Sequence, residues 1–114
     1  MVLKKFYEQI GGGYDRALSR FPNEQMLEKF VLKYKADPTC AQLEKAINEE
    51  DTKAAFLAAH TLKGVAQNLG FERLAAAASV VTEQLRGDNG HAEKGSVSAV
   101  YAAHDEIIAA IEQI

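Results

Sequence analysis

The sequence predicts an all-α fold, an antiparallel four-helix bundle with additional short N-terminal helices. Apolar side chains recur at helical spacing along most of the chain, and no convincing strand pattern interrupts them. The connections between the helical stretches are short, which favours antiparallel neighbours and therefore a bundle. A length of 114 residues suits one hydrophobic core, so we expect a single domain over residues 1–114.

The first third of the chain predicts three short helices. Gly11–Gly13 separates the first from the second, and Pro22 stands near the start of the third. Each helix has one apolar stripe at helical spacing. The stripes are Leu3, Phe6, Tyr7 and Ile10; then Tyr14, Leu18 and Phe21; then Met26, Leu27, Phe30, Val31 and Tyr34.

Aspartate caps indicate where the next two helices begin. Asp37 is a good N-cap, and Pro38 behind it suits the first turn of a short helix. Asp51 can cap a longer helix that runs over about residues 52–69. Gly70 fits the position that ends this longer helix, because glycine adopts the left-handed conformation found there.

Two further helices complete the predicted bundle. The chain returns after the long helix, and GDNGHAEKG at residues 87–95 is the one clear loop before the last helix. Both helices have an inward apolar stripe. These stripes are Phe71, Leu74, Ala78 and Leu85, then Val97, Val100, Tyr101, Ile108 and Ile111.

Composition narrows the class of protein. A net charge of −3 provides no basic footprint, so we expect no nucleic-acid partner. The apolar runs are far shorter than the ~20 residues that cross a bilayer, so we expect no membrane segment. The N-terminus lacks the apolar stretch of a signal peptide, and the lone Cys40 excludes an internal disulfide. These features favour a cytoplasmic protein, and we expect a monomer.

The predicted helix over residues 52–69 has two distinct faces. On a helical wheel, four polar or small residues share the face opposite the core: His60, Lys63, Gly64 and Gln67. The core face is expected to hold Ala55, Ala58, Leu62, Val65, Ala66 and Leu69. His60 is therefore predicted to be exposed on the outside of an otherwise buried helix.

Two large apolar residues accompany His60. Phe56 lies one turn before it on the same side, and Leu57 flanks Phe56. Large apolar side chains on a solvent face suggest a docking surface for a partner. The alternative for Phe56 is packing beneath a neighbouring helix, and Gln67 is either part of the contact surface or simply solvated.

The polar face has the chemistry of phosphoryl transfer. A neutral imidazole is a nucleophile near neutral pH, and His60 supplies one. Lys63, one turn away, places a positive charge where it can meet an anion on the ring nitrogen. Gly64 costs about 1 kcal/mol of helix stability relative to alanine, but it lets another protein approach the helix closely.

Other chemistries are not supported around His60. No His, Cys, Asp or Glu lies three or four residues from it, as a metal site on this helix would require. Nothing places a nucleophile and an orienting carboxylate for a hydrolase triad. Gly11–Gly13 is not followed by the Gly-Lys-Ser/Thr of a P-loop, and no nucleotide-binding motif is present.

Residues 59–75, AHTLKGVAQNLGFERLA, resemble the signature of histidine-containing phosphotransfer (HPt) domains of two-component phosphorelays. The matching elements are His60, Lys63, Gly64 and Gly70. The resemblance implies a four-helix bundle in which His60 carries the phosphoryl group on Nε2. It also implies that Lys63 contacts this group and that Gly64 gives clearance to a receiver domain.

The resemblance also implies the partners. They are receiver domains of response regulators and a hybrid histidine kinase. In such relays the aspartate and the Mg²⁺ belong to the receiver, so no cofactor is expected in this chain. The resemblance implies a phosphocarrier without kinase activity of its own.

One position departs from the family pattern. Many members carry Gln or Glu 22 residues after the histidine to orient its ring, and this chain has Thr82 there with Glu83 next to it. Gly70 turns the hairpin midway, so positions 60 and 82 should lie at similar height. Either Thr82 or Glu83 orients His60 under this hypothesis.

We expect the other two histidines to lie in different environments. His104 stands within the last apolar stripe, so a core or half-buried position is predicted, and Asp105 and Glu106 beside it would repel a phosphoryl group. His91 lies in the loop and is expected to be exposed and inert.

Two other functions remain open from the sequence. One is a non-catalytic helical adaptor that docks receiver or kinase domains through Phe56 and Leu57 without being phosphorylated. The other is a kinase fragment, which would need an ATP-binding domain that this chain lacks. The direction of phosphoryl flow is not specified by the sequence.

Overall fold

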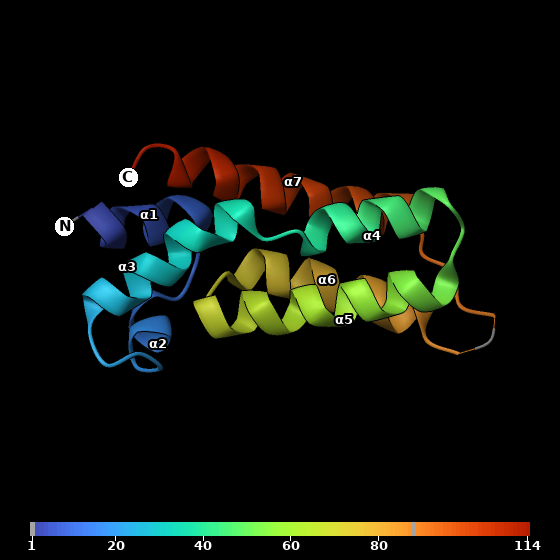
Figure 1. The fold of residues 1–114 in the computed structure, drawn as a ribbon, viewed down its shortest axis with the longest axis horizontal. Helices are drawn as coiled ribbons and strands as arrows, with labels where there is room; N and C mark the ends of the chain where they lie inside the picture. The colour runs from blue at the N-terminus through green and yellow to red at the C-terminus, as the bar shows by residue number, and fades with distance from the viewer. Residues whose placement is uncertain (1, 88) are drawn as a thin grey trace.

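The computed structural model describes residues 2–87 and 89–114, and this part of the chain is helical with no strand (Figure 1). Met1 and Asp88, the latter in the predicted loop, lie outside the described residues. The elements are α1 (Val2–Ile10), α2 (Tyr14–Leu18), α3 (Glu24–Lys33), the 3₁₀ turn η1 (Tyr34–Ala36), α4 (Thr39–Asn48), α5 (Thr52–Leu69), α6 (Glu72–Leu85) and α7 (Lys94–Ile111). The all-α prediction is confirmed.

The last four helices form the body of the molecule, which measures 45 × 23 × 20 Å. They run antiparallel in chain order along its long axis, and α5 packs between α4 and α6 (Figure 1). The α7 helix packs on α6 and also contacts α1. Because α5 has neighbours on two sides, its remaining side is the surface on which residues can be presented to a partner.

Local capping explains where α4 and α5 begin and end. The Asp37 carboxylate accepts a hydrogen bond from the Thr39 amide at 2.8 Å, and Pro38 follows Asp37 as expected. The Asp51 carboxylate accepts from the Ala54 amide at 3.1 Å, directly before Thr52. Gly70 has a φ of 72° and ends α5 in the left-handed conformation.

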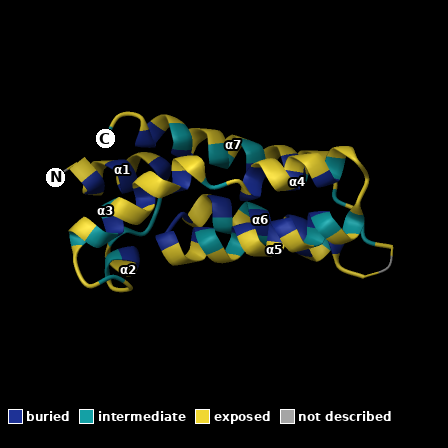
Figure 2. Cartoon of the chain, viewed as in Figure 1, coloured by how far each residue is buried: buried dark blue, intermediate teal, exposed yellow. Residues whose placement is uncertain are grey.

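The core runs the length of the bundle and receives apolar side chains from every α-helix (Figure 2). Three sequence predictions about it need correction. Phe30 was expected to face inward but is 38% exposed, and Val65 is half-buried rather than buried. On α7 the buried isoleucine is Ile107, while Ile108 and Tyr101 are half-buried. The reason is that the position of each neighbouring helix, which periodicity alone does not specify, decides which edge of a stripe is covered.

The N-terminal helices are tied to the turn between α5 and α6. The Tyr7 hydroxyl donates to the Leu69 carbonyl at 2.6 Å, and the Gly13 amide donates to the Gly70 carbonyl at 3.1 Å. A guanidinium nitrogen of Arg20 donates to the Gln67 carbonyl. These bonds satisfy carbonyl groups at the C-terminal end of α5, which has no next turn of helix to use them.

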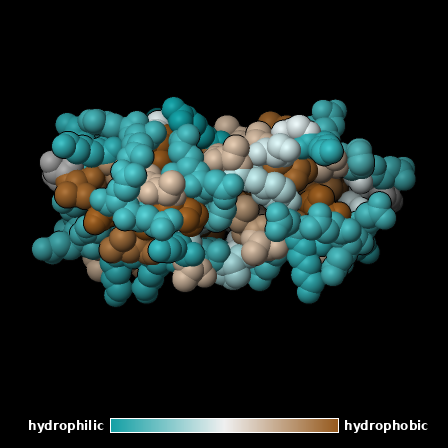
Figure 3. Space-filling model, turned by 90° about the horizontal axis from the view of Figure 1, so that it is seen from above, coloured by the Kyte–Doolittle hydropathy of each residue, from teal (hydrophilic) through white to brown (hydrophobic). Residues whose placement is uncertain are grey.

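The surface is mainly polar on the side seen in Figure 3, where hydrophobic side chains appear as separate patches among hydrophilic ones. Across the described ranges, none of the helices has the length and apolar character that crossing a bilayer demands.

Candidate functional site

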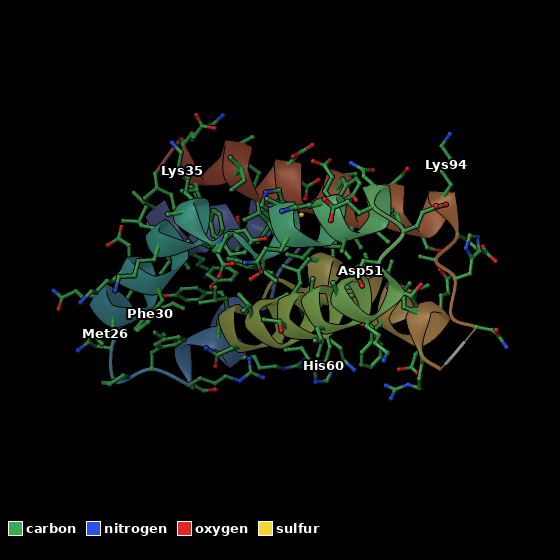
Figure 4. The ribbon with its side chains drawn as sticks, turned by 45° about the vertical axis from the view of Figure 1, so that its right-hand side comes forward. Met26, Phe30, Lys35, Asp51, His60 and Lys94 are labelled. Carbon is green, nitrogen blue, oxygen red and sulfur yellow. The ribbon has the colours of Figure 1, made fainter. Side chains whose placement is uncertain are left out.

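The outer face of α5 presents the polar residues that the helical wheel places there. His60, Gly64 and Gln67 are exposed, and Lys63 is half-buried. Figure 4 shows the His60 side chain pointing away from the bundle, on the side of the molecule opposite Lys94 at the start of α7. The opposite face of α5 is buried, including Ala59, which the wheel had not included in the core.

Helix geometry places the His60 ring over Phe56. A side chain on an α-helix leans toward the N-terminus, so it covers the residue four positions earlier. The two rings have centroids 6.1 Å apart and planes that differ by 6°, an offset stack. The imidazole therefore lies nearly parallel to the Phe56 ring and displaced from it, and its nitrogen atoms remain on the ring edge.

The same geometry explains what Gly64 does for His60. A side chain at position 64 would lean back toward position 60, and glycine leaves that space empty. A Cβ built on Gly64 meets no atom within 4 Å. Packing within the folded chain therefore does not explain why position 64 is a glycine. Close approach of a partner protein is an explanation that remains.

Lys63 lies on the side of His60 that faces α6. Its charge is close enough to Glu83 on that helix to help lower the pKa of the Glu83 carboxyl. The larger cause is Arg86, whose guanidinium donates to both Glu83 oxygens at 3.3 and 2.9 Å. A flexible cation thus lies one helical turn after His60, near Glu83.

The hypothesis that Thr82 orients His60 is wrong. Thr82 is fully buried, and its hydroxyl donates to the Ala78 carbonyl of its own helix at 2.7 Å. The Thr82 side chain lies in the core, whereas His60 is exposed. Glu83 is at the surface, where its carboxylate is bound to Arg86.

Phe56 and Leu57 differ in exposure. Phe56 is half-buried and packs against the core, which agrees with the packing alternative that the sequence left open, whereas Leu57 is 63% exposed. A largely apolar hollow of about 370 Å³ lies beside them. It is lined by Thr52, Lys53, Phe56, Leu57, Leu85 and Gly87.

Arg86 was not singled out in the sequence, although a signal for it exists. Its guanidinium carbon lies 5.2 Å from the centre of the Phe56 ring, in a cation–π contact. The hairpin register that places position 82 level with His60 places Arg86 level with Phe56. An arginine at that height, three residues after a glutamate, is visible in the sequence once the register is drawn.

The other two histidines are placed as the sequence predicts. His104 is half-buried, its Nδ1 lies 2.7 Å from the Tyr34 hydroxyl, and burial lowers its pKa. His91 is exposed in the loop before α7. In residues 2–87 and 89–114, no group of three or more His, Cys, Asp or Glu side chains is arranged to hold a metal ion.

The Hpt domain family model matches residues 25–114, from the first turn of α3 to the end of the sequence. The chain belongs to the Hpt domain family. Hpt domains are phosphocarrier modules of phosphorelays rather than catalysts, and they interact with receiver domains and kinases. The matched region contains the whole α5–α6 hairpin, while α1 and α2 precede it. Searches of curated proteins and of solved structures found no significant match.

Proposed function

We propose that His60 is the phosphoacceptor of this Hpt domain. It accepts a phosphoryl group from the aspartate of a receiver domain, or from a kinase, and passes it to the receiver of a response regulator. The single observation that carries the proposal is the unobstructed space around Gly64, one turn from an exposed imidazole. That space serves nothing within the fold, and a receiver's active site needs it.

The transfer requires little of this chain beyond a positioned nucleophile. The lone pair of the neutral His60 Nε2 attacks the phosphorus of the aspartyl phosphate and forms the N–P bond. The P–O bond to the aspartate breaks, and its electron pair stays on the released carboxylate. The ring proton remains on Nδ1. Transfer to the next receiver is the same step reversed, so catalysis rests on positioning and charge.

Neighbouring residues have supporting roles in this proposal. Lys63 contacts the phosphoryl oxygens and offsets their negative charge. Leu57, Gln67 and the hollow beside Phe56 form the surface on which the receiver docks. The Mg²⁺ and the aspartate belong to the receiver, so the chain works without a bound cofactor of its own. We propose that it acts as a cytoplasmic monomer.

The test is phosphoryl transfer from a receiver domain carrying a labelled aspartyl phosphate. The expected result is a label on this chain that is lost in acid and stable in alkali, as phosphohistidine is. His60→Ala is expected to abolish the label, and His104→Ala and His91→Ala are expected to keep it. Label on the His60→Ala variant would overturn the site assignment.

The exposed Leu57 and the apolar hollow also favour a second function, an adaptor that docks receivers or kinases without being phosphorylated. Labelling of the wild-type chain separates the two functions. For an adaptor, His60→Ala leaves receiver binding unchanged and no donor produces phosphohistidine on the wild-type chain. For a phosphocarrier, the wild-type chain is labelled.

A further inference from the structure

The His60 ring is oriented without a hydrogen bond from another side chain. Within the described part of the chain, its ring contact is the stack on Phe56. The residue that the family pattern would use, Thr82, is buried and bonded to Ala78. Glu83 is bonded to Arg86. The orientation of the imidazole therefore has to come from packing.

Phe56 is suited to restrict the His60 imidazole because its own ring is fixed by packing. Its ring is half-buried, packs against the core, and lies one helical turn before His60. The nearly parallel, displaced arrangement of the two rings favours the His60 rotamers in which the imidazole keeps this contact with Phe56. Both ring nitrogens lie in the plane of the imidazole, so this contact leaves them free to react.

A second helix steadies Phe56. Arg86 at the end of α6 lies over the Phe56 ring at 5.2 Å from its centroid. Glu83, one turn earlier on α6, accepts two hydrogen bonds from the same guanidinium and limits where it can go. Four side chains thus form a continuous row across the hairpin, in the order Glu83, Arg86, Phe56 and His60.

We infer that Phe56 is a positioning residue for His60, held in place by Arg86, and that this row of stacked side chains replaces the hydrogen-bonding Gln or Glu of the family pattern. The inference rests on the proposed role of His60. It assigns Phe56 to orienting the nucleophile, whereas the sequence had suggested that Phe56 contacts the partner. The two roles differ in one respect: a positioning residue acts even when no partner protein is present.

The test uses a phosphodonor too small to need a docking surface. Phosphoramidate transfers its phosphoryl group to an imidazole nitrogen: its P–N bond breaks, ammonia leaves, and the new N–P bond forms on His60. Phe56→Leu removes the aromatic face but keeps an apolar side chain, and Phe56→Tyr keeps the face. Val80→Ala is the control, because Val80 is an exposed apolar residue on α6 that takes part neither in the row nor in the proposed docking surface.

We expect Phe56→Leu to slow phosphorylation by phosphoramidate about fivefold, the scale of one aromatic pair. Arg86→Gln, at a surface position, should slow it by about twofold, the scale of an exposed cation–π contact. Phe56→Tyr should restore the wild-type rate, and Val80→Ala should leave it unchanged.

Nuclear magnetic resonance of the unphosphorylated chain supplies a readout that does not depend on phosphoryl transfer. Loss of the Phe56 ring should shift the His60 ring-proton signals, because the ring current of the neighbouring Phe56 acts on them, and Phe56→Tyr should preserve those shifts. Arg86→Gln serves the same measurement if Phe56→Leu does not fold, through a smaller shift of the same signals.

Distinct outcomes separate the inference from the proposed function. A wild-type chain that takes no label from receiver or phosphoramidate would contradict the function, while the ring-proton shifts would still test the stack. Unchanged ring-proton shifts and an unchanged phosphoramidate rate in Phe56→Leu would overturn the inference. Slowing only with the receiver as donor would also overturn it, because that pattern belongs to a docking residue.

Discussion

His60 and His104 stand on helices of the same length, α5 and α7, each with 18 residues, and the two sites differ in which part of the imidazole the protein uses. At His104 the protein occupies a ring nitrogen through the Tyr34 hydroxyl. At His60 the protein packs the ring beside Phe56, nearly parallel to it, and no hydrogen bond to a ring nitrogen is found within the described residues. The two sites therefore differ in whether a ring nitrogen is already engaged by a neighbouring side chain.

The surroundings extend the same contrast. Asp105 is next to His104, and the Tyr34 ring meets the imidazole edge-on at 5.5 Å. Next to His60 stand Lys63, a cation, and Gly64, which has open space around it. An added phosphoryl group would meet a like charge at the first site and an opposite charge at the second.

The largest expected effect comes from closing the space beside His60. Gly64→Arg should lower transfer from a receiver at least about tenfold, the cost of roughly 1.4 kcal/mol in the transition state. Folding should not suffer, since replacing a helical glycine removes a cost of about 1 kcal/mol. Initial transfer rates and urea unfolding measure the two quantities.

Gly95→Arg is the matched control for that substitution. Gly95 is also helical and also has nothing within 4 Å of a built Cβ, but it lies on α7. Transfer should be unchanged in this variant. Equal losses at both positions, or unfolding of a Gly64→Ala variant, would contradict the clearance role of Gly64.

A smaller effect is expected from removing the positive charge of Lys63. Lys63→Ala should lower the transfer rate by about fivefold, because one charge-assisted contact to the phosphoryl group is lost, worth about 1 kcal/mol. Lys94→Ala removes a lysine from the first turn of α7, on the other side of the molecule, and should have no effect (Figure 4). Single-turnover transfer kinetics with both variants would check this, and a slow Lys94→Ala variant would point to net charge instead.

The smallest effect concerns the pH dependence of stability. Burial lowers the pKa of His104 below its ordinary value, and Asp105 and Asp37 oppose this shift without cancelling it. The unfolded chain therefore binds a proton at His104 more readily than the folded chain. The contribution of His104 is fully present above its unfolded pKa of about 6.5 and is lost as the pH falls through the folded value.

The free energy of unfolding should accordingly decrease as the pH is lowered from about 7 to about 5. His104→Gln removes the titrating group, so part of that decrease should disappear. Urea denaturation at several pH values measures it. An unchanged pH profile in the variant would mean that other groups cause the dependence.

Much of the fold could be predicted because its signals are local. Asp51 and Gly70 specify the ends of α5 through their own hydrogen bonds and backbone conformation. The exposure of His60 follows from the buried stripe on the other face of the same helix. None of these predictions needs the position of a second helix.

The incorrect predictions concern residues whose exposure or contacts depend on the position of a second helix. Phe30 and Ile108 lie at edges of their stripes, and the placement of neighbouring helices determines which edge is covered. Thr82 was expected near His60 but is buried, because the direction of its side chain follows from the packing of α6, which the hairpin turn does not specify. The contact between Arg86 and Phe56 also crosses two helices, so no single-helix pattern indicates it.

The hydrogen bonds from the N-terminal helices to the end of α5 determine how far this domain can be shortened. The Leu69, Gln67 and Gly70 carbonyls accept from Tyr7, Arg20 and Gly13, all of which precede the residues that the family model matches. A graft of residues 25–114 onto another protein would remove all three donors, and of these carbonyls Gln67 would keep its bond from the Gly70 amide. The segment to be transferred is therefore longer than the region that the family model matches. A fusion protein that is meant to keep these bonds at the end of α5 has to include α1 and α2.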